Sequence, residues 1–454
     1  MGDISLEEKV RPNELIEGPI LPALLKFCGP VRVALFLQSL YGAVDLMVVG
    51  RFGDAASVSG VGTGSAVMQL VTMVLAGLTT GATVVIGRHI GERRPEAAGR
   101  TVGAAVALFA VVAIVLTGLM VAFTRPLVLL MQTPAEAVDK AVEYVRICSW
   151  GIVFITAYNV LSGIFRGLGD SKRPMIFVAI ACVTNIAGDL FCVGVLHMDA
   201  AGAAVATVAA QAVSVVLSLV IISRQELPFH FTRKSICFDR VEIGETLRIG
   251  APIALQDALV HLSFLLLNAI INHLGLLQSA GYGVAERVTG FIFLVPSAVM
   301  AGASTLVAQN IGANRPDRAR QVLFTSMAAG TAAGFFLFCA GFFFGGPLSS
   351  IFSKDAGVVE QSAAYLRGFS ADCLLTCVLF AFTGYFNGCG RTVYVMIQGI
   401  TSSFLLRVPA SYLLSITKGA TLTRIGLAAP LATVYGIVFY LICYRRMRRA
   451  EGGE

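Results

Sequence analysis

The sequence has few charged residues, which fill 13% of its 454 positions, whereas soluble domains carry about 25%. This shortage excludes an ordinary soluble protein, because a chain of this length needs a large polar surface in water. Hydrophobic residues fill 56% of the positions, a composition that suits the hydrocarbon of a bilayer. The net charge of +7 does not indicate a nucleic-acid partner, because the basic residues lie in short loops between apolar stretches. The sequence therefore predicts a membrane protein.

Three further signals are missing. The polar N-terminus has no apolar core before a small-residue cleavage site, so we expect no cleavable signal peptide. The ten cysteines form no CxxC pair and mostly lie in apolar runs, which favours packing over metal binding or disulfides. No DDxxD-like cluster occurs, which argues against an intramembrane transferase that binds a metal diphosphate. We expect no enzyme, no cofactor and no structural metal.

Long stretches without Asp, Glu, Lys or Arg predict transmembrane helices, each of which needs about 20 apolar residues. Apolar segments that contain a few charged residues complete a set of twelve spans. The expected spans are 27–49, 56–86, 101–123, 142–165, 174–196, 201–223, 249–273, 278–309, 321–345, 360–387, 392–414 and 425–444. The predicted fold class is an all-α polytopic membrane protein.

The basic residues indicate the orientation of these spans. Of the 34 lysines and arginines, 24 fall on one side of the membrane, among them Lys9, Arg11, Arg166, Arg233 and Lys234, and six fall on the other. Cytoplasmic loops are enriched in Lys and Arg. Both termini are therefore predicted to be cytoplasmic, which agrees with an even number of spans in the cell inner (cytoplasmic) membrane.

A single offset of 221 residues relates two halves of the chain. IGERRP (90–95) resembles IGANRP (311–316), EYVRICS (143–149) resembles AYLRGFS (364–370), and GIFRGLG (163–169) resembles GYFNGCG (384–390). Three separated matches at one offset indicate an internal duplication.

The duplication predicts two six-helix bundles, a first half at residues 27–223 and a second half at 249–444. Residues 1–26, 224–248 and 445–454 should form a cytoplasmic N-terminal segment, a cytoplasmic linker and a basic tail. Halves with an even number of spans enter the membrane from the same side, so a pseudo-two-fold axis along the membrane normal should relate them. We expect binding in the cleft between the halves and alternating access by rocking around it.

Two acidic residues lie deep inside the first-half spans, Asp45 in span one and Asp189 in span five. A carboxylate at the centre of a membrane helix costs roughly 2.5–3.5 kcal/mol on insertion scales, so such residues usually serve function. Tyr41 and Asn185 precede them by four positions and share their helix faces. With Thr207 of span six, these groups predict an oxygen-rich site for a coupling H+ or Na+. The alternative is a protonated aspartate that serves packing.

The acid pair is not duplicated, because the +221 equivalents are Leu266 and Ala410. The second half instead offers polar candidates near or within its spans, namely Asp257, His261, Asp372 and Arg407. Arg407 in mid-span should need an anionic partner or a wet cavity, whereas His261 is more simply a buried core histidine than a proton site. Coupling is therefore expected in the first half, with the second half serving as a moving wall.

Several motifs resemble one known family. They are LYGAVDLMVVGRFGD (40–54) after Pro30, IGERRPEAA (90–98), FRGLGDSKRPM (165–175), GAAVATVAAQ (202–211) and AQNIGANRPDRA (308–319). In this order they are similar to the multidrug and toxic compound extrusion (MATE) family over about residues 25–444.

The resemblance implies a V-shaped antiporter that exports organic cations or amphipathic compounds against an inward H+ or Na+ gradient. In the DinF-like branch of that family, a functional network occupies positions that fall here on Tyr41, Asp45, Asn185, Asp189 and Thr207. The NorM-like branch carries a glutamate in span seven, where this sequence has Val260 beside His261. This departure argues against a NorM-like second-half cation site.

Two other functions are less well supported. A lipid-linked saccharide flippase of the same superfamily would need a strongly cationic cavity, for which only Arg407 and Arg287 lie deep in the chain. A channel is disfavoured by the duplicated cleft and the isolated acids. The expected partners are the lipid bilayer and cationic or amphipathic small molecules, handled by a monomer.

Overall fold

A computed structural model describes residues 14–224, 228–229, 235–417 and 419–452. The first half contains α1 (Glu14–Glu17), α2 (Ile20–Phe52), α3 (Ala55–Gly91), α4 (Pro95–Leu130), α5 (Ala135–Trp150), α6 (Ile152–Gly167), α7 (Lys172–Asp189), η1 (Leu190–Val195) and α8 (Asp199–Ser223). The second half contains α9 (Arg240–Asn272), α10 (Leu276–Ile292), α11 (Leu294–Gly312), α12 (Pro316–Ser350), α13 (Ala356–Gly388), α14 (Thr392–Thr401), η3 (Ser402–Arg407), α15 (Val408–Ile416), α16 (Leu422–Gly426) and α17 (Ala428–Gly452). No strand occurs among these described residues.

The predicted all-α polytopic fold is confirmed. Within the part of the chain that the structure describes, eleven helical segments are long and apolar enough to cross a membrane, and α5 with α6 supplies a twelfth if this pair, bent by 53°, counts as one span. The expected span 142–165 is thus broken rather than continuous. Gly151 lies at the break, where an added side-chain carbon would overlap Val208.

The repeated IGxxRP motif builds the same turn twice. Arg93 and Asn314 adopt left-handed backbone angles, with φ of 57° and 55°. Pro95 and Pro316 then occupy the first positions of α4 and α12. Proline suits this position because its fixed φ is helical and its missing N–H would have no helical partner there. The repeated motif in the sequence therefore corresponds to the same helix–turn–helix connection in both halves.

Aspartate caps several helices. Asp54 begins α3 by accepting a hydrogen bond of 2.7 Å from the backbone N–H of Ser57, and Asp355 begins α13 in the same way. Such caps satisfy backbone donors that have no partner in the first helical turn. Hydrogen bonding by Ser57 also lowers the pKa of the exposed Asp54 carboxyl group.

Equivalent residues of the two halves meet at the centre of the molecule. Gly87 lies against Ala308, its own counterpart at +221. A side-chain carbon added to Gly87 would lie 3.3 Å from the Cβ atom of Ala308. Gly91 packs on the carbonyl of Gln309, and its counterpart Gly312 packs on the carbonyl of Arg88, the counterpart of Gln309. These reciprocal contacts locate the pseudo-two-fold axis between α3 and α11.

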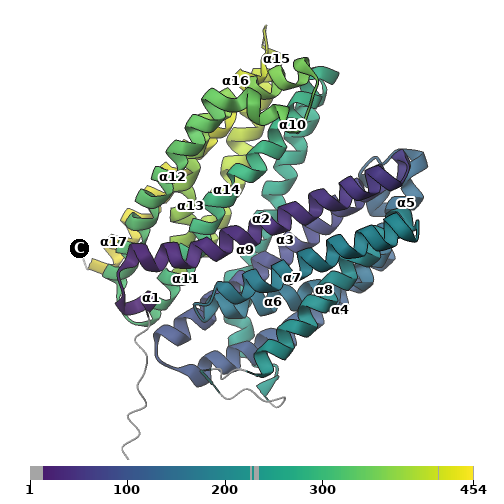
Figure 1. Ribbon diagram of the computed structural model, residues 1–454. Coiled ribbons are helices and arrows are strands. Elements are labelled where there is room, and N and C mark those ends of the chain that lie inside the picture. Colours follow the sequence, from purple (N-terminus) through teal and green to yellow (C-terminus); the bar gives the residue numbers. More distant parts are fainter. Residues whose placement is uncertain (1–13, 225–227, 230–234, 418, 453–454) are drawn as a thin grey trace, which may run out of the picture.

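Helices α2 and α9 each pack against both halves. The start of α2 contributes Leu24 and Phe27 to a core of second-half residues, whereas Val49 near its end joins the first-half core. Likewise Ile249 at the start of α9 packs on α3, and Ile271 at its end joins a second-half core. Figure 1 shows the two groups of helices close together near α1 and α17 and diverging toward α5 and α16.

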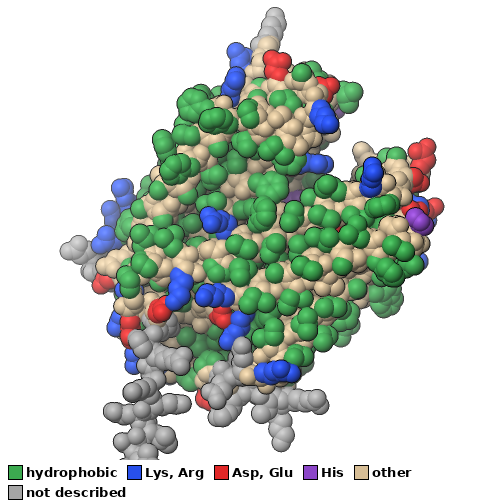
Figure 2. Space-filling model, viewed as in Figure 1, with side chains coloured by type: hydrophobic (Ala, Val, Ile, Leu, Met, Phe, Trp, Pro, Cys, Tyr) green, Lys and Arg blue, Asp and Glu red, His purple; other side chains and the backbone are tan. Residues whose placement is uncertain are grey.

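Hydrophobic side chains cover the flanks of the helices (Figure 2). Ile114, Val183 and Phe336 are 68%, 69% and 73% exposed. Large apolar residues this exposed suit contact with lipid rather than water. Of the basic residues used to predict orientation, Lys9, Arg11, Arg233 and Lys234 lie outside the described residues.

Candidate functional site

A cavity of about 440 Å³ lies between the two halves. The first half contributes part of α2, part of α3 and Arg166, whereas α9, α11, α13, α14, η3 and α17 of the second half supply most of the lining. Binding between the halves was predicted. The second half, which was expected to serve as a moving wall, supplies most of the cavity surface.

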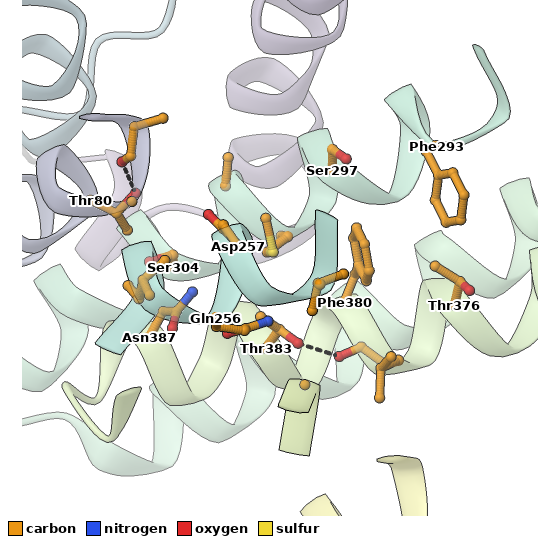
Figure 3. Close-up of a pocket in the computed structure, with 18 of the residues that line it drawn as sticks. Thr80, Gln256, Asp257, Phe293, Ser297, Ser304, Thr376, Phe380, Thr383 and Asn387 are labelled. Atoms are coloured by element: carbon orange, nitrogen blue, oxygen red, sulfur yellow. Dashed lines mark hydrogen bonds between the residues drawn. The ribbon is translucent and has the colours of Figure 1, made fainter. Parts of the chain in front are cut away.

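The cavity combines apolar surface with a few polar groups. Phe293 and Phe380 stack with ring centroids 6.2 Å apart, and they lie to one side of Gln256 and Asp257, which come from α9 (Figure 3). Ser304 and Asn387 lie on the other side of the α9 pair. Small-molecule sites are typically lined in this way, with polar groups fixing orientation.

Three of the four second-half candidates share this cavity. Asp257, Asp372 and Arg407 line it, and His261 does not. The Oδ2 atom of the buried Asp372 accepts a hydrogen bond of 2.9 Å from Thr376. The guanidinium carbon of Arg407 lies 4.6 Å from the centroid of the Phe264 ring. Arg407 thus lines a cavity and also lies near an acidic residue, Asp372.

Arg166 also lines the cavity, although the orientation analysis assigned it to a cytoplasmic loop. It lies in the last turn of α6, and its Nε atom is buried without a hydrogen-bond partner among the described residues. Its +221 counterpart, Asn387, lines the same cavity. Helix α6 continues to Gly167, so Arg166 belongs to the helix, one residue beyond the expected end of its span.

The first-half candidates form a separate cluster that lines no part of this cavity. Thr207 donates a long hydrogen bond of 3.4 Å to Oδ2 of Asp45, and Asn185 donates one of 3.4 Å to the Thr207 hydroxyl. The carboxyl groups of Asp45 and Asp189 lie close enough for their charges to interact. Asp45 is 5% exposed and Asp189 is fully buried. Helices α2, α7 and α8 thus bring together residues far apart in the sequence.

This cluster has more buried acceptors than donors. Oδ1 of Asp45, both carboxylate oxygens of Asp189 and Oδ1 of Asn185 are buried without a hydrogen-bond partner among the described residues. Each such buried group costs about 1–3 kcal/mol. Two ionised carboxylates have no hydrogen to share, so a proton or a hard cation between them would relieve this cost.

Two tyrosines flank the cluster. Tyr41 lies near Asp45, as its spacing predicted. Tyr144 of α5, which the sequence analysis did not select as a site residue, is buried and interacts with the hydroxyl of Thr207. Its ring packs directly against Gly64 of α3. The signal available in the sequence was its match to Tyr365 at +221, which we used only to detect the repeat.

A π-helical turn adjoins a charged residue in the fifth span of each half. Segment η1 starts directly after Asp189, and segment η3 ends at Arg407. Such turns are rare and are often found at functional sites. Pro409 follows η3 closely and has no backbone N–H for a regular helical hydrogen bond.

Several known proteins are similar to this chain. A model of the MatE family matches residues 30–191 and, a second time, residues 252–413. "Probable multidrug resistance protein YoeA" of Bacillus subtilis is 26% identical over 407 residues, or 86% of each chain. "Multidrug export protein MepA" of Staphylococcus aureus is 21% identical over 413 residues, or 89% of each chain.

Solved structures show the same fold. One described as the outward-facing conformation of a multidrug resistance MATE family transporter aligns with a TM-score of 0.90 at 22% identity. The alignment covers 96% of this chain and 98% of that one. The double match to the family model also confirms the duplication predicted from the +221 offset.

Proposed function

The chain belongs to the MatE family and is a multi-pass membrane transporter rather than an enzyme, and from that premise we propose that it exports amphipathic drug-like compounds in exchange for protons. The observation that carries this proposal is the donor-poor cluster around Asp45 and Asp189, buried in the first half away from the cavity. Its five residues match the DinF-like pattern, to which we assign the chain. Export by the curated relatives supports the direction of transport.

A proton fits the cluster better than Na+. Asp45 and Asp189 lie close enough for their carboxyl groups to interact, so one proton shared between them converts repulsion into a strong hydrogen bond. Na+ would need several oxygen ligands around it. Asn185 already donates a hydrogen bond to the Thr207 hydroxyl, and Thr207 donates one to Asp45. In the proposed cycle, a proton enters this pair as substrate leaves the cavity.

Helix α2 connects the two sites. Asp45 lies near one end of α2, and Val31 and Leu35 of the same helix line the cavity. Leu24 and Phe27 pack in the second-half core. A change in α2 packing on protonation therefore reaches both the cavity wall and the contact between the halves. Pro30 removes one hydrogen bond inside α2, which lowers the cost of such a change.

The basic loops support a cytoplasmic location for both termini, in the inner membrane. The narrow end of the molecule, near α1 and α17, then faces the cytoplasm, and the divergent end faces outward (Figure 1). We propose a monomer as the transporting unit, since one chain contains both halves and the cavity. The flippase alternative is not favoured, because Asp257 and Asp372 offset the charges of Arg166 and Arg407 in the cavity.

The experiment is efflux of ethidium from proteoliposomes that contain the purified full-length chain. One set carries only a proton gradient and a second set only a Na+ gradient, and ionophores that collapse each gradient serve as controls. Efflux with the proton gradient alone supports the proposal. Efflux with the Na+ gradient alone would overturn proton coupling and retain antiport, and movement with neither gradient would overturn the transport proposal itself.

A further inference from the structure

Arg407 lies in the wall of the central cavity with N–H donors that no described residue satisfies. Its Nε and Nη1 atoms are buried without hydrogen-bond partners, and among the described residues it forms no ion pair. The Nη2 atom of Arg407 has no hydrogen bond among the described residues either, but it is not buried, so a ligand can reach it. A guanidinium has five N–H donors in a fork that matches a carboxylate. This residue therefore has donors to offer a ligand.

Phe264 and Asp372 lie near Arg407, and neither accepts a hydrogen bond from it. Phe264 lies against its guanidinium at 4.6 Å and contributes no charge. Asp372 attracts Arg407 electrostatically, yet its Oδ2 atom is held by Thr376. An arginine in mid-span costs roughly 2.5–3.5 kcal/mol on insertion scales. An anion of the transported compound would offset this cost and satisfy the free donors.

The same cavity also presents a separate negative group. Asp257 lines it from α9 and forms no ion pair or hydrogen bond among the described residues. Opposite charges that are not paired with each other are both available to one ligand. The apolar lining of the same cavity includes the stacked rings of Phe293 and Phe380. The lining thus fits a compound with a cationic group, a flat apolar body and an anionic group.

We propose that this cavity selects zwitterionic aromatic compounds, with a carboxylate of the compound on Arg407 and its cationic group near Asp257. The proposal rests on the export function proposed above and assigns its substrate class. Arg166, also unpaired at Nε, lies in the wall from the other half and adds positive potential. A purely cationic compound occupies the cavity less well, because it leaves the donors of Arg407 unsatisfied.

The test compares rhodamine 110, which has a free carboxylate, with rhodamine 123, its methyl ester. Fluorescence polarisation with the purified full-length chain measures the dissociation constant of each dye. We expect the wild-type protein to bind the free acid about tenfold more tightly, because a hydrogen bond between charged groups increases affinity by about this factor. Arg407→Gln should abolish this preference, and Arg407→Lys should retain part of it. Arg287→Gln is the matched control, because Arg287 is exposed in α10 and lines no part of the cavity.

An equal or weaker affinity of the wild type for the free acid would overturn the inference, and this comparison needs no variant. So would an unchanged preference in folded Arg407→Gln. Proteoliposome efflux of rhodamine 123 tests the export proposal separately. Dye export without a preference for the free acid would overturn the substrate class alone. A preference in binding without export would support the site and overturn the transport function.

Discussion

The hydroxyl of Thr207 donates to Oδ2 of Asp45 across 3.4 Å and joins α8 to α2 over 162 positions of sequence. Thr207 also accepts a hydrogen bond from Asn185, so it bridges an amide and a carboxylate. No residue of this cluster lines the central cavity. The proposed coupling between the two sites therefore requires helix packing rather than competition for one binding place.

Asp45→Asn should abolish proton-driven efflux while the protein still inserts in the membrane. The amide keeps the size of the side chain and cannot exchange a proton with Asp189 at physiological pH. Ethidium efflux from proteoliposomes and the amount of protein in the membrane are the two measurements. Asp139→Asn is the matched control, because Asp139 is exposed in α5. Normal efflux by Asp45→Asn would remove Asp45 from the coupling mechanism.

Thr207→Ala should reduce proton-driven efflux about two- to tenfold, because the hydrogen bond to Asp45 is long and a hydrogen bond contributes a net of roughly 0.5–1.5 kcal/mol. Thr207→Ser keeps the hydroxyl group and should retain most of the activity. The initial efflux rate at several external pH values distinguishes a changed proton affinity from a loss of folded protein. Equal activity of the alanine and serine variants would show that the hydroxyl does not take part.

The membrane fold was predictable because the bilayer imposes a length and a composition on every span. The first-half cluster was predictable for a related reason: a carboxylate is too costly in hydrocarbon to lie there without a partner. The spacing of Asp45 from Tyr41, and of Asp189 from Asn185, fixed their shared helix faces. No local spacing rule could identify Tyr144, because it meets Thr207 only through the packing of α5 on α8.

The cavity was predictable in location but not in lining. The offset of 221 residues indicated two halves and hence a cleft, yet it could not show how the halves close on each other. Arg166 was placed just outside its span because the end of a helix cannot be read from a Gly-rich polar segment. Asp372 and Arg407 were selected as mid-span charges, but their common cavity depends on the packing of α13 beside η3 and α17.

Glu242→Ala should weaken the contact between the halves at their narrow end. Its Oε2 atom accepts a hydrogen bond of 2.6 Å from Thr101 of α4 and lies 3.4 Å from Nε2 of His89 of α3. Removal leaves two polar groups without this partner, at a cost of about 1–3 kcal/mol. We expect a lower melting temperature in detergent. Glu245→Ala, at an exposed position of the same helix, should have little effect; equal melting temperatures of the two variants would contradict this role.

Gly91→Ala and Gly312→Ala should each destabilise the protein, and by similar amounts. A methyl group at Gly91 would overlap the carbonyl of Gln309, and one at Gly312 would overlap the carbonyl of Arg88. Backbone atoms cannot move aside as a flexible side chain can, so α3 and α11 must separate. Overpacking of this kind costs about 1–3 kcal/mol. Thermal unfolding in detergent measures the loss.

The control is Gly118→Ala in α4, because nothing lies within 4 Å of a carbon added at Gly118. Alanine there should leave stability unchanged or raise it by up to about 1 kcal/mol, since glycine is unfavourable inside a helix. The pseudo-two-fold relationship makes the comparison sharper than either variant alone. A loss confined to Gly91→Ala or to Gly312→Ala would show that the two reciprocal contacts are not energetically equivalent, and that the halves close asymmetrically around the axis at Gly87 and Ala308.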